Sequence, residues 1–199
     1  MSFSKSVDVN GVTLNFVEKG TGQPVILIHG IPTDYRAWAA QTDVLSASFR
    51  TISYSRRCAY PNQREDYENS TIQKNAEDLA QLIKAKDAVP AHLIGHSYGA
   101  FAALYCAYKN PGLLRSLIPV EPYVPSLIIK DPKSSVEMLS LLLRKPSLAI
   151  AARNYLNHSL NPALKALDEG KNEKASELFV AGLQGKTDAF SRFQNPSNQ

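Results

Sequence analysis

The stretch Ala91-His-Leu-Ile-Gly-His-Ser-Tyr-Gly-Ala100 decides the fold of this chain. It begins as a short apolar run and ends in Gly-x-Ser-x-Gly, and a helix-forming run from Phe101 to Lys109 follows at once. Gly95 and Gly99 permit a main-chain turn too tight for side chains. A bare Gly-x-Ser-x-Gly occurs by chance, but a strand before it and a helix after it are the context that a nucleophile requires. The pattern therefore predicts that Ser97 is held at the top of a strand with its hydroxyl exposed.

The segments around this turn alternate between strand and helix patterns. Apolar and polar residues alternate on both sides of Asn10-Gly11, which predicts a hairpin. The apolar run 25–28 is typical of a strand buried on both faces of a parallel sheet. We expect strands at 6–10, 12–18, 25–28, 49–54, 91–95 and 114–120, and helices at 34–47, 70–86 and 101–109. This order indicates an α/β fold, a mostly parallel sheet with flanking helices.

The composition changes after Glu121. Prolines become frequent, and no strand-like run appears from Ile129 to the last residue. Helical patterns occupy about 134–144, 146–158, 163–168 and 172–184. We therefore expect two domains, an α/β core over residues 1–121 and an all-helical segment over residues 122–199.

Composition and charge exclude several classes of function. The 199 residues are 44% hydrophobic and carry a net charge of +4 from scattered basic residues, without the basic stripe of a nucleic-acid-binding protein. No apolar run approaches the ~20 residues of a membrane span, and no signal peptide is recognisable. The two cysteines and four histidines do not have metal-ligand spacing. We expect a cytoplasmic protein with free thiols and no metal ion.

A serine nucleophile needs two further kinds of group. A general base, usually a histidine oriented by a carboxylate, must accept its proton. Two N–H donors must face the developing oxyanion, and we assign them to Tyr98, which follows the serine, and Ile31, in the loop after the strand 25–28. Gly30 lets that loop approach closely. We expect His29 to brace the loop through its ring nitrogens; the alternative is a turn histidine without a role in the site.

The chain resembles the α/β-hydrolase superfamily. The resemblance rests on His29-Gly-Ile-Pro32 with Trp38 downstream, on residues 53–56 and on the Gly-x-Ser-x-Gly turn, and it covers about residues 6–121. It implies a hydrolase core, a helical cap in residues 122–199 and no cofactor. Esterases, cofactor-free perhydrolases, C–C hydrolases, epoxide hydrolases and haloalkane dehalogenases share this motif. The last two use an aspartate nucleophile, so Ser97 favours acyl transfer to water.

Two departures from the family pattern stand out. The loop after the strand 49–54 usually reads Asp-x-Arg-Gly-x-Gly but here reads Ser-Arg-Arg-Cys-Ala-Tyr-Pro, so we expect a less tight loop. Arg56 and Arg57 either line the mouth of the site or are solvated, and we favour solvation.

The second departure concerns the last two strands of the family core. They normally follow the cap and supply the general-base histidine, and no histidine of this chain stands in that place. A missing C-terminal segment or a second chain would supply both. Glu121, at the end of the sixth strand, is a candidate triad acid; its alternative role is a hydrogen-bonded carboxylate at the hinge of the cap.

The sequence thus predicts a serine hydrolase that forms an acyl-enzyme on Ser97 with a small, mostly apolar ester. The rivals are a non-catalytic or slowly turning-over ligand-binding protein on the same scaffold, a perhydrolase and a C–C hydrolase. The predicted substrate-lining residues, which are otherwise packing within the cap, are Tyr123, Val124, Leu127, Met138, Leu142 and Tyr155.

Overall fold

The computed structural model describes residues 5–62, 70–122 and 135–184. Contacts within the chain divide it into two compact units, Met1–Val124 and Pro125–Gln199. The sequence had placed the division after Glu121, where the last expected strand ends.

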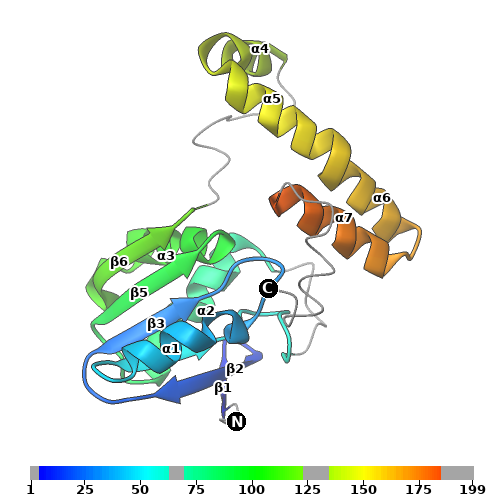
Figure 1. The fold of residues 1–199 in the computed structure, drawn as a ribbon. Coiled ribbons are helices and arrows are strands. Elements are labelled where there is room, and N and C mark those ends of the chain that lie inside the picture. Colours follow the sequence, from blue (N-terminus) through cyan, green and yellow to red (C-terminus); the bar gives the residue numbers. More distant parts are fainter. Residues whose placement is uncertain (1–4, 63–69, 123–134, 185–199) are drawn as a thin grey trace. The chain divides into compact units, whose positions relative to one another are not determined.

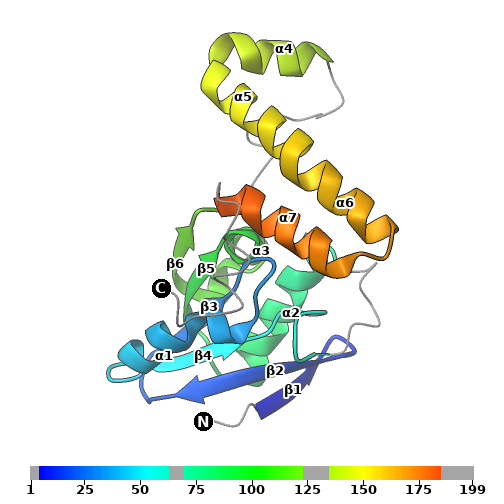
Figure 2. The same cartoon turned by 45° about the vertical axis from the view of Figure 1, so that its right-hand side comes forward.

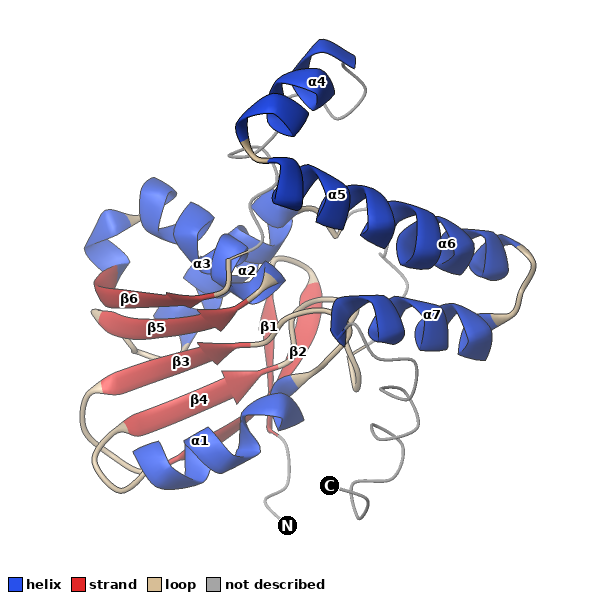
Figure 3. Cartoon of the chain, turned by 45° about the horizontal axis from the view of Figure 1, so that its top comes forward, coloured by secondary structure: helices blue, strands red, loops and turns tan. Residues whose placement is uncertain are grey.

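A six-stranded sheet forms the centre of the first unit (Figures 1 and 3). Strands β1 and β2 form an antiparallel hairpin across Asn10 and Gly11, which both have the positive φ of a type I′ turn. β2 pairs antiparallel with β4, whereas β4, β3, β5 and β6 run parallel. The expected mostly parallel sheet is confirmed, with β4 and β3 at its centre and β6 at one edge. The strands, in spatial order, are β1 (Lys5–Val9), β2 (Val12–Lys19), β4 (Arg50–Tyr54), β3 (Pro24–Ile28), β5 (Ala91–His96) and β6 (Leu114–Val120).

Helices cover both faces of the sheet. α1 (Ala39–Leu45) lies on one face, and α2 (Ile72–Ala85) and α3 (Tyr98–Lys109) lie on the other (Figures 2 and 3). The single helix expected over 34–47 is instead a 3-10 turn, η1 (Tyr35–Trp38), followed by α1. Asp34 caps η1, because its carboxylate accepts a hydrogen bond from the Arg36 N–H at 2.9 Å.

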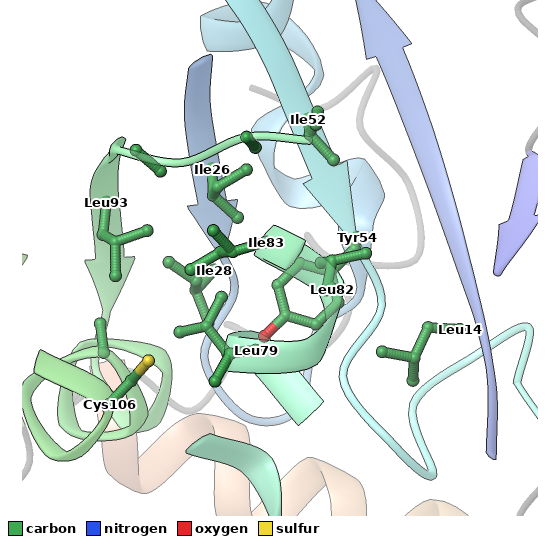
Figure 4. Close-up of a cluster of buried hydrophobic side chains, with 14 of the residues drawn as sticks. Leu14, Ile26, Ile28, Ile52, Tyr54, Leu79, Leu82, Ile83, Leu93 and Cys106 are labelled. Carbon is green, nitrogen blue, oxygen red and sulfur yellow. The ribbon is translucent and has the colours of Figure 1, made fainter. Parts of the chain in front are cut away.

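The hydrophobic core fills the space between the sheet and helices α2 and α3 (Figure 4). Every residue of β3 from Val25 to Ile28 is at most 3% exposed, as the apolar run predicted. Cys106 of α3 lies in this core, and burial raises the pKa of its thiol to about 11. β6, which follows the short turn η3 (Pro111–Leu113), is different: Ile118 is 52% exposed.

The second unit consists of helices over its described residues. The expected helices at 146–158 and 163–168 are joined, because a π-helical turn links α5 directly to α6. α7 packs back against this turn: the Ser159 hydroxyl donates to the Leu178 carbonyl and lies against Gly182, which leaves no room for a Cβ. The elements are α4 (Ser135–Arg144), α5 (Pro146–Tyr155), the π turn η5 (Leu156–Leu160), α6 (Asn161–Asp168) and α7 (Asn172–Gln184).

Candidate active site

Ser97 occupies a sharp turn between the end of β5 and the start of α3. Its φ of 52° and ψ of −119° lie in a region that residues with side chains rarely adopt, and such strain collects at functional sites. The Ser97 N–H donates to the Val120 carbonyl of β6 at 2.9 Å, and the Ser97 carbonyl accepts from the Phe101 N–H at 3.2 Å. Sheet and helix together hold this backbone, and the side chain remains half-buried.

Three glycines let main-chain segments meet around Ser97. A Cβ on Gly95 would lie 2.7 Å from the Gly99 carbonyl oxygen, and a Cβ on Gly99 would collide with the main-chain oxygens at the end of β3. A Cβ on Gly30 would lie 3.1 Å from the Ser97 Cβ. The loop after β3, which contains Ile31, therefore passes directly beside the serine.

His29 is fully buried, and both of its ring nitrogens make hydrogen bonds. Nε2 accepts from the Arg56 main-chain N–H at 3.0 Å, so Nδ1 carries the proton and donates to the Gly30 carbonyl at 2.7 Å. Burial, and next the nearby Arg56 cation, lower the pKa of His29 to about 3. The ring is therefore neutral at physiological pH, and these bonds connect the loop after β3 to the loop after β4.

The expectation that Arg56 and Arg57 are solvated is wrong, because they are only 5% and 4% exposed. β4 lies next to β3 in the sheet, so the loops that follow these parallel strands meet at the same edge. The Arg57 guanidinium makes two hydrogen bonds to the buried Asp78 carboxylate of α2, at 2.6 and 2.7 Å.

Arg56 reaches the loop that contains the predicted oxyanion donor. Its Nε donates to the His29 carbonyl at 2.9 Å, and its Nη2 donates to the Gly30 carbonyl at 3.2 Å. Its Nη1 donates to Asn75 Oδ1 of α2 at 3.3 Å. The guanidinium carbon also lies 4.8 Å from the centre of the Tyr98 ring, a cation–π contact. Sequence reasoning considered Arg56 for the mouth of the site but favoured solvation, because the residues that it contacts are distant from it in the sequence.

The loop after β4 is also more ordered by contacts than its lack of glycine suggested. Cys58 adopts φ 62°, a conformation that favours glycine. The Ser55 hydroxyl accepts from the Tyr35 N–H at 3.2 Å and donates to the Tyr60 carbonyl at 2.6 Å. The Asn62 amide donates to the Ser55 carbonyl at 2.8 Å. Side-chain hydrogen bonds thus hold residues 55–62 of this loop, although it lacks the glycines of the family pattern, and the expectation of a less tight loop stays a prediction.

Glu121 follows β6 with φ 46°, and its side chain is 85% exposed. Its carboxylate oxygen lies 3.8 Å from His96 Nε2, and this pair is exposed to solvent. Of the other histidines, His92 bonds Ser116 Oγ through Nδ1 at 2.7 Å, and His158 lies in the second unit. In the parts of the chain that the structure describes, these contacts leave the general base unassigned.

The predicted substrate-lining residues stay a prediction, because none of them belongs to the described residues of the first unit. Tyr123, Val124 and Leu127 lie outside the described residues. Leu142, on α4, is 47% exposed, and Tyr155, at the end of α5, lies against Gly182 within the second unit. Met138 is also on α4.

The described residues show neither a metal-binding cluster nor a membrane-spanning helix. No group of three or more histidine, cysteine or acidic side chains among residues 5–62, 70–122 and 135–184 is arranged to hold a metal ion. No helix in those ranges has the length and apolar character needed to cross a membrane.

Comparison with known proteins identifies relatives for most of the chain. Residues 25–196 match the model of the alpha/beta hydrolase family. The chain is 33% identical over 125 residues to a 2-(acetamidomethylene)succinate hydrolase of Mesorhizobium japonicum, an alignment that covers 61% of this chain and 44% of that protein. It is 30% identical over 127 residues to a non-heme chloroperoxidase of Kitasatospora aureofaciens, covering 63% and 46%.

A solved structure supports the same fold. An epoxide hydrolase from Vigna radiata matches with a TM-score of 0.63 and 20% identity, over 91% of this chain and 54% of that one. The chain matches less than half the length of the two curated relatives. Because the family model covers residues 25–196 of the 199, the chain belongs to the alpha/beta hydrolase family.

Proposed function

We propose that this chain carries the nucleophile and the oxyanion hole of a serine hydrolase for a small, mostly apolar ester or related acyl compound. The observation that carries the proposal is the left-handed backbone of Ser97 at the turn between β5 and α3, directly beside Gly30. The Ser97 oxygen attacks the acyl carbonyl and loses its proton to a base. The carbonyl re-forms as the alkoxide leaves with a proton, and water then hydrolyses the acyl-enzyme.

Two main-chain amides are assigned to the oxyanion. Tyr98 is the first residue of α3, so its N–H lies at the positive end of the helix dipole. Ile31 follows Gly30 in the loop that passes beside Ser97. Within the family, epoxide hydrolases and dehalogenases use an aspartate nucleophile, and the serine of this chain favours acyl transfer instead.

The general base is assigned to a segment outside these residues, in a longer polypeptide or a second chain. β6 supports this assignment: it ends the described sheet, and Ile118 and Val120 on it are 52% and 38% exposed. A strand paired there would cover these side chains and place its own end near Ser97, because β6 is hydrogen-bonded to the Ser97 N–H. Glu121, one residue further along, is the proposed acid of the triad.

Labelling with a fluorophosphonate tests the nucleophile. The probe is applied to the native, active preparation, and the intact masses of its polypeptides are measured at the same time. We expect one phosphonyl group on Ser97, and a burst of p-nitrophenol from p-nitrophenyl acetate equal to the labelled fraction. Ser97→Ala should lose both signals, and Ser116→Ala, at an exposed serine of β6, should keep them. Labelling elsewhere, or none, would contradict the proposal.

Perhydrolysis is the second candidate, and the similarity to a non-heme chloroperoxidase favours it. Hydrogen peroxide would then attack the Ser97 acyl-enzyme, giving a peracid and free serine. The test is bromination of monochlorodimedone in acetate, bromide and peroxide. We expect product with the wild type and none with Ser97→Ala if this candidate holds; equal rates would reject it.

An ester that stabilises the protein thermally without being consumed would favour the ligand-binding alternative.

A further inference from the structure

We infer that Arg56 is a positioning residue, which sets and polarises the Ile31 N–H by binding the carbonyl of the same peptide unit. The inference rests on the proposed function, since it concerns one of the two amides assigned there to the oxyanion. Arg56 itself is not expected to touch substrate.

The geometry of the Gly30–Ile31 peptide provides the first argument. A trans peptide is planar, so its C=O and N–H point in opposite directions, and fixing one fixes the other. The Gly30 carbonyl oxygen accepts from His29 Nδ1 at 2.7 Å, Thr33 Oγ1 at 3.1 Å, Thr33 N at 3.4 Å and Arg56 Nη2 at 3.2 Å. This carbonyl is thus held by donors on one side of the peptide, and the Ile31 N–H must point to the other.

Charge distinguishes Arg56 from the other donors. His29 is neutral and the Thr33 hydroxyl is neutral, whereas the guanidinium is a cation that is only 5% exposed. A hydrogen bond from a charged donor is roughly twice as strong as a neutral one, and the effect grows where water is excluded. Hydrogen bonds in series polarise one another. The cation at the Gly30 oxygen therefore makes the Ile31 N–H a stronger donor toward an oxyanion.

Arg56 also contacts both halves of the proposed oxyanion hole. Its Nε donates to the His29 carbonyl, which precedes the Gly30–Ile31 peptide, and its guanidinium lies over the Tyr98 ring at 4.8 Å. Tyr98 supplies the other amide. One side chain thus links the loop after β3 to the first turn of α3. Arg57 is directed differently, toward the Asp78 carboxylate.

An arylboronic acid tests the inference without requiring turnover. Phenylboronic acid binds a nucleophilic serine as a tetrahedral adduct whose oxygen fills the oxyanion hole. We measure its dissociation constant by 11B NMR, and the amide proton shift of Ile31 in the free protein by 15N-edited NMR. Arg56→Gln should weaken binding by on the order of tenfold and move the Ile31 resonance upfield. Arg56→Lys, which keeps the charge, should recover part of both effects.

Two matched variants isolate the effect of charge. Thr33→Val removes a neutral donor to the same oxygen and should weaken binding by less than Arg56→Gln does. Arg36→Gln removes an exposed arginine that pairs with Asp34 and should leave both readouts unchanged.

The possible failures are distinguishable. Boronate binding as tight in Arg56→Gln as in the wild type, with an unmoved Ile31 resonance, overturns the inference and leaves the proposed function intact. If the wild type binds phenylboronic acid no better than Ser97→Ala does, the proposed function is overturned. In that case, an Ile31 resonance that does not move in Arg56→Gln overturns the positioning role as well. If Arg56→Gln does not fold, the two readouts are taken from Arg56→Lys. A dissociation constant and an Ile31 amide shift equal to those of the wild type would then overturn the inference.

Discussion

The two flanks of β5 differ although both are parallel strands of one sheet. On the inner flank, residues 25–28 of β3 are at most 3% exposed, and the buried His29 holds the loop that follows. On the outer flank, Ile118 of β6 is 52% exposed, and the Glu121 side chain that follows is 85% exposed. Ser97 therefore follows a strand with a fully buried neighbour, β3, on one side and a partly exposed neighbour, β6, on the other.

This difference teaches where each part of the proposed chemistry resides. Stabilising an oxyanion requires main-chain donors held in place before the substrate arrives, and on the inner flank hydrogen bonds from His29 and Arg56 hold the loop that contains the proposed donor Ile31. Activating the serine hydroxyl requires a base, which we propose is brought by a segment that pairs with β6 on the outer flank.

The largest effect is expected from Gly99→Ala, which disrupts the close contact between the start of α3 and the end of β3. The new Cβ would collide with the carbonyl oxygens of Ile28 and His29, which are main-chain atoms of a buried strand and cannot move cheaply. We expect a loss of about 4 kcal/mol or more in the free energy of unfolding, or no folded protein. Urea unfolding followed by circular dichroism measures it. Gly112→Ala, whose Cβ would meet nothing within 4 Å, is the control and should be neutral.

The next largest loss in the free energy of unfolding is expected from Arg57→Met. It leaves the Asp78 carboxylate, which is 2% exposed, without its bidentate partner, and breaking a buried pair typically costs about 3–5 kcal/mol. Combining it with Asp78→Leu should recover most of that loss, because no uncompensated charge remains. The same unfolding experiment measures the single and the double variant. A double variant that is less stable than Arg57→Met would contradict the role of the pair.

The pH dependence of stability tests the neutral state of His29. The unfolded ring binds a proton below its ordinary pKa of 6.5, whereas the folded ring resists protonation down to about 3. Stability should therefore fall as the pH is lowered through this window, by up to about 1.4 kcal/mol per pH unit.

Unfolding between pH 6.5 and 5 measures this slope above the range where carboxylates with lowered pKa, such as Asp34, are protonated. For Asp34, hydrogen bonds from Arg36 outweigh the upward shift from burial. His29→Gln should flatten the slope, and His96→Gln, on the outer flank, serves as the control. A wild type with constant stability over this range would show that the buried ring accepts a proton.

The smallest effect is expected on the outer flank. Ile118→Ala should cost less than about 1 kcal/mol, because the side chain is 52% exposed and leaves no cavity. Ile26→Ala, on fully buried β3, is the matched variant and should cost about 2–5 kcal/mol. Denaturant midpoints compare the two. Similar losses would mean that β6 is covered, and the difference between flanks would disappear.

Local patterns were sufficient to predict most of the fold. The alternation around Asn10-Gly11 predicted the hairpin, and the continuous apolar run of β3 predicted a strand buried on both faces. Gly-x-Ser-x-Gly between an apolar run and a helix former predicted the turn at Ser97. In each case the signal lies within a few residues, and neighbours in sequence determine the conformation.

What the sequence did not reveal depends on contacts between distant residues. In the sequence, Arg56 and Arg57 look like solvated charges. In the fold, the pairing of β4 with β3 brings Arg56 against His29, and α2 brings Asp78 against Arg57, residues about 20 to 27 positions away. The join between α5 and α6 was also not predicted. The expected helices end at 158 and begin again at 163, whereas the structure connects them through the π turn.

That π turn at Leu156–Leu160 has a consequence for the helices on either side. A turn closed by i→i+5 bonds holds about one residue more than an α-helical turn, and each residue advances a helix by roughly 100°. α6 is therefore out of phase with α5, although the two form one rod. Any helical wheel drawn straight through residues 146–168 would assign the wrong azimuth to one half, and each half must be drawn separately.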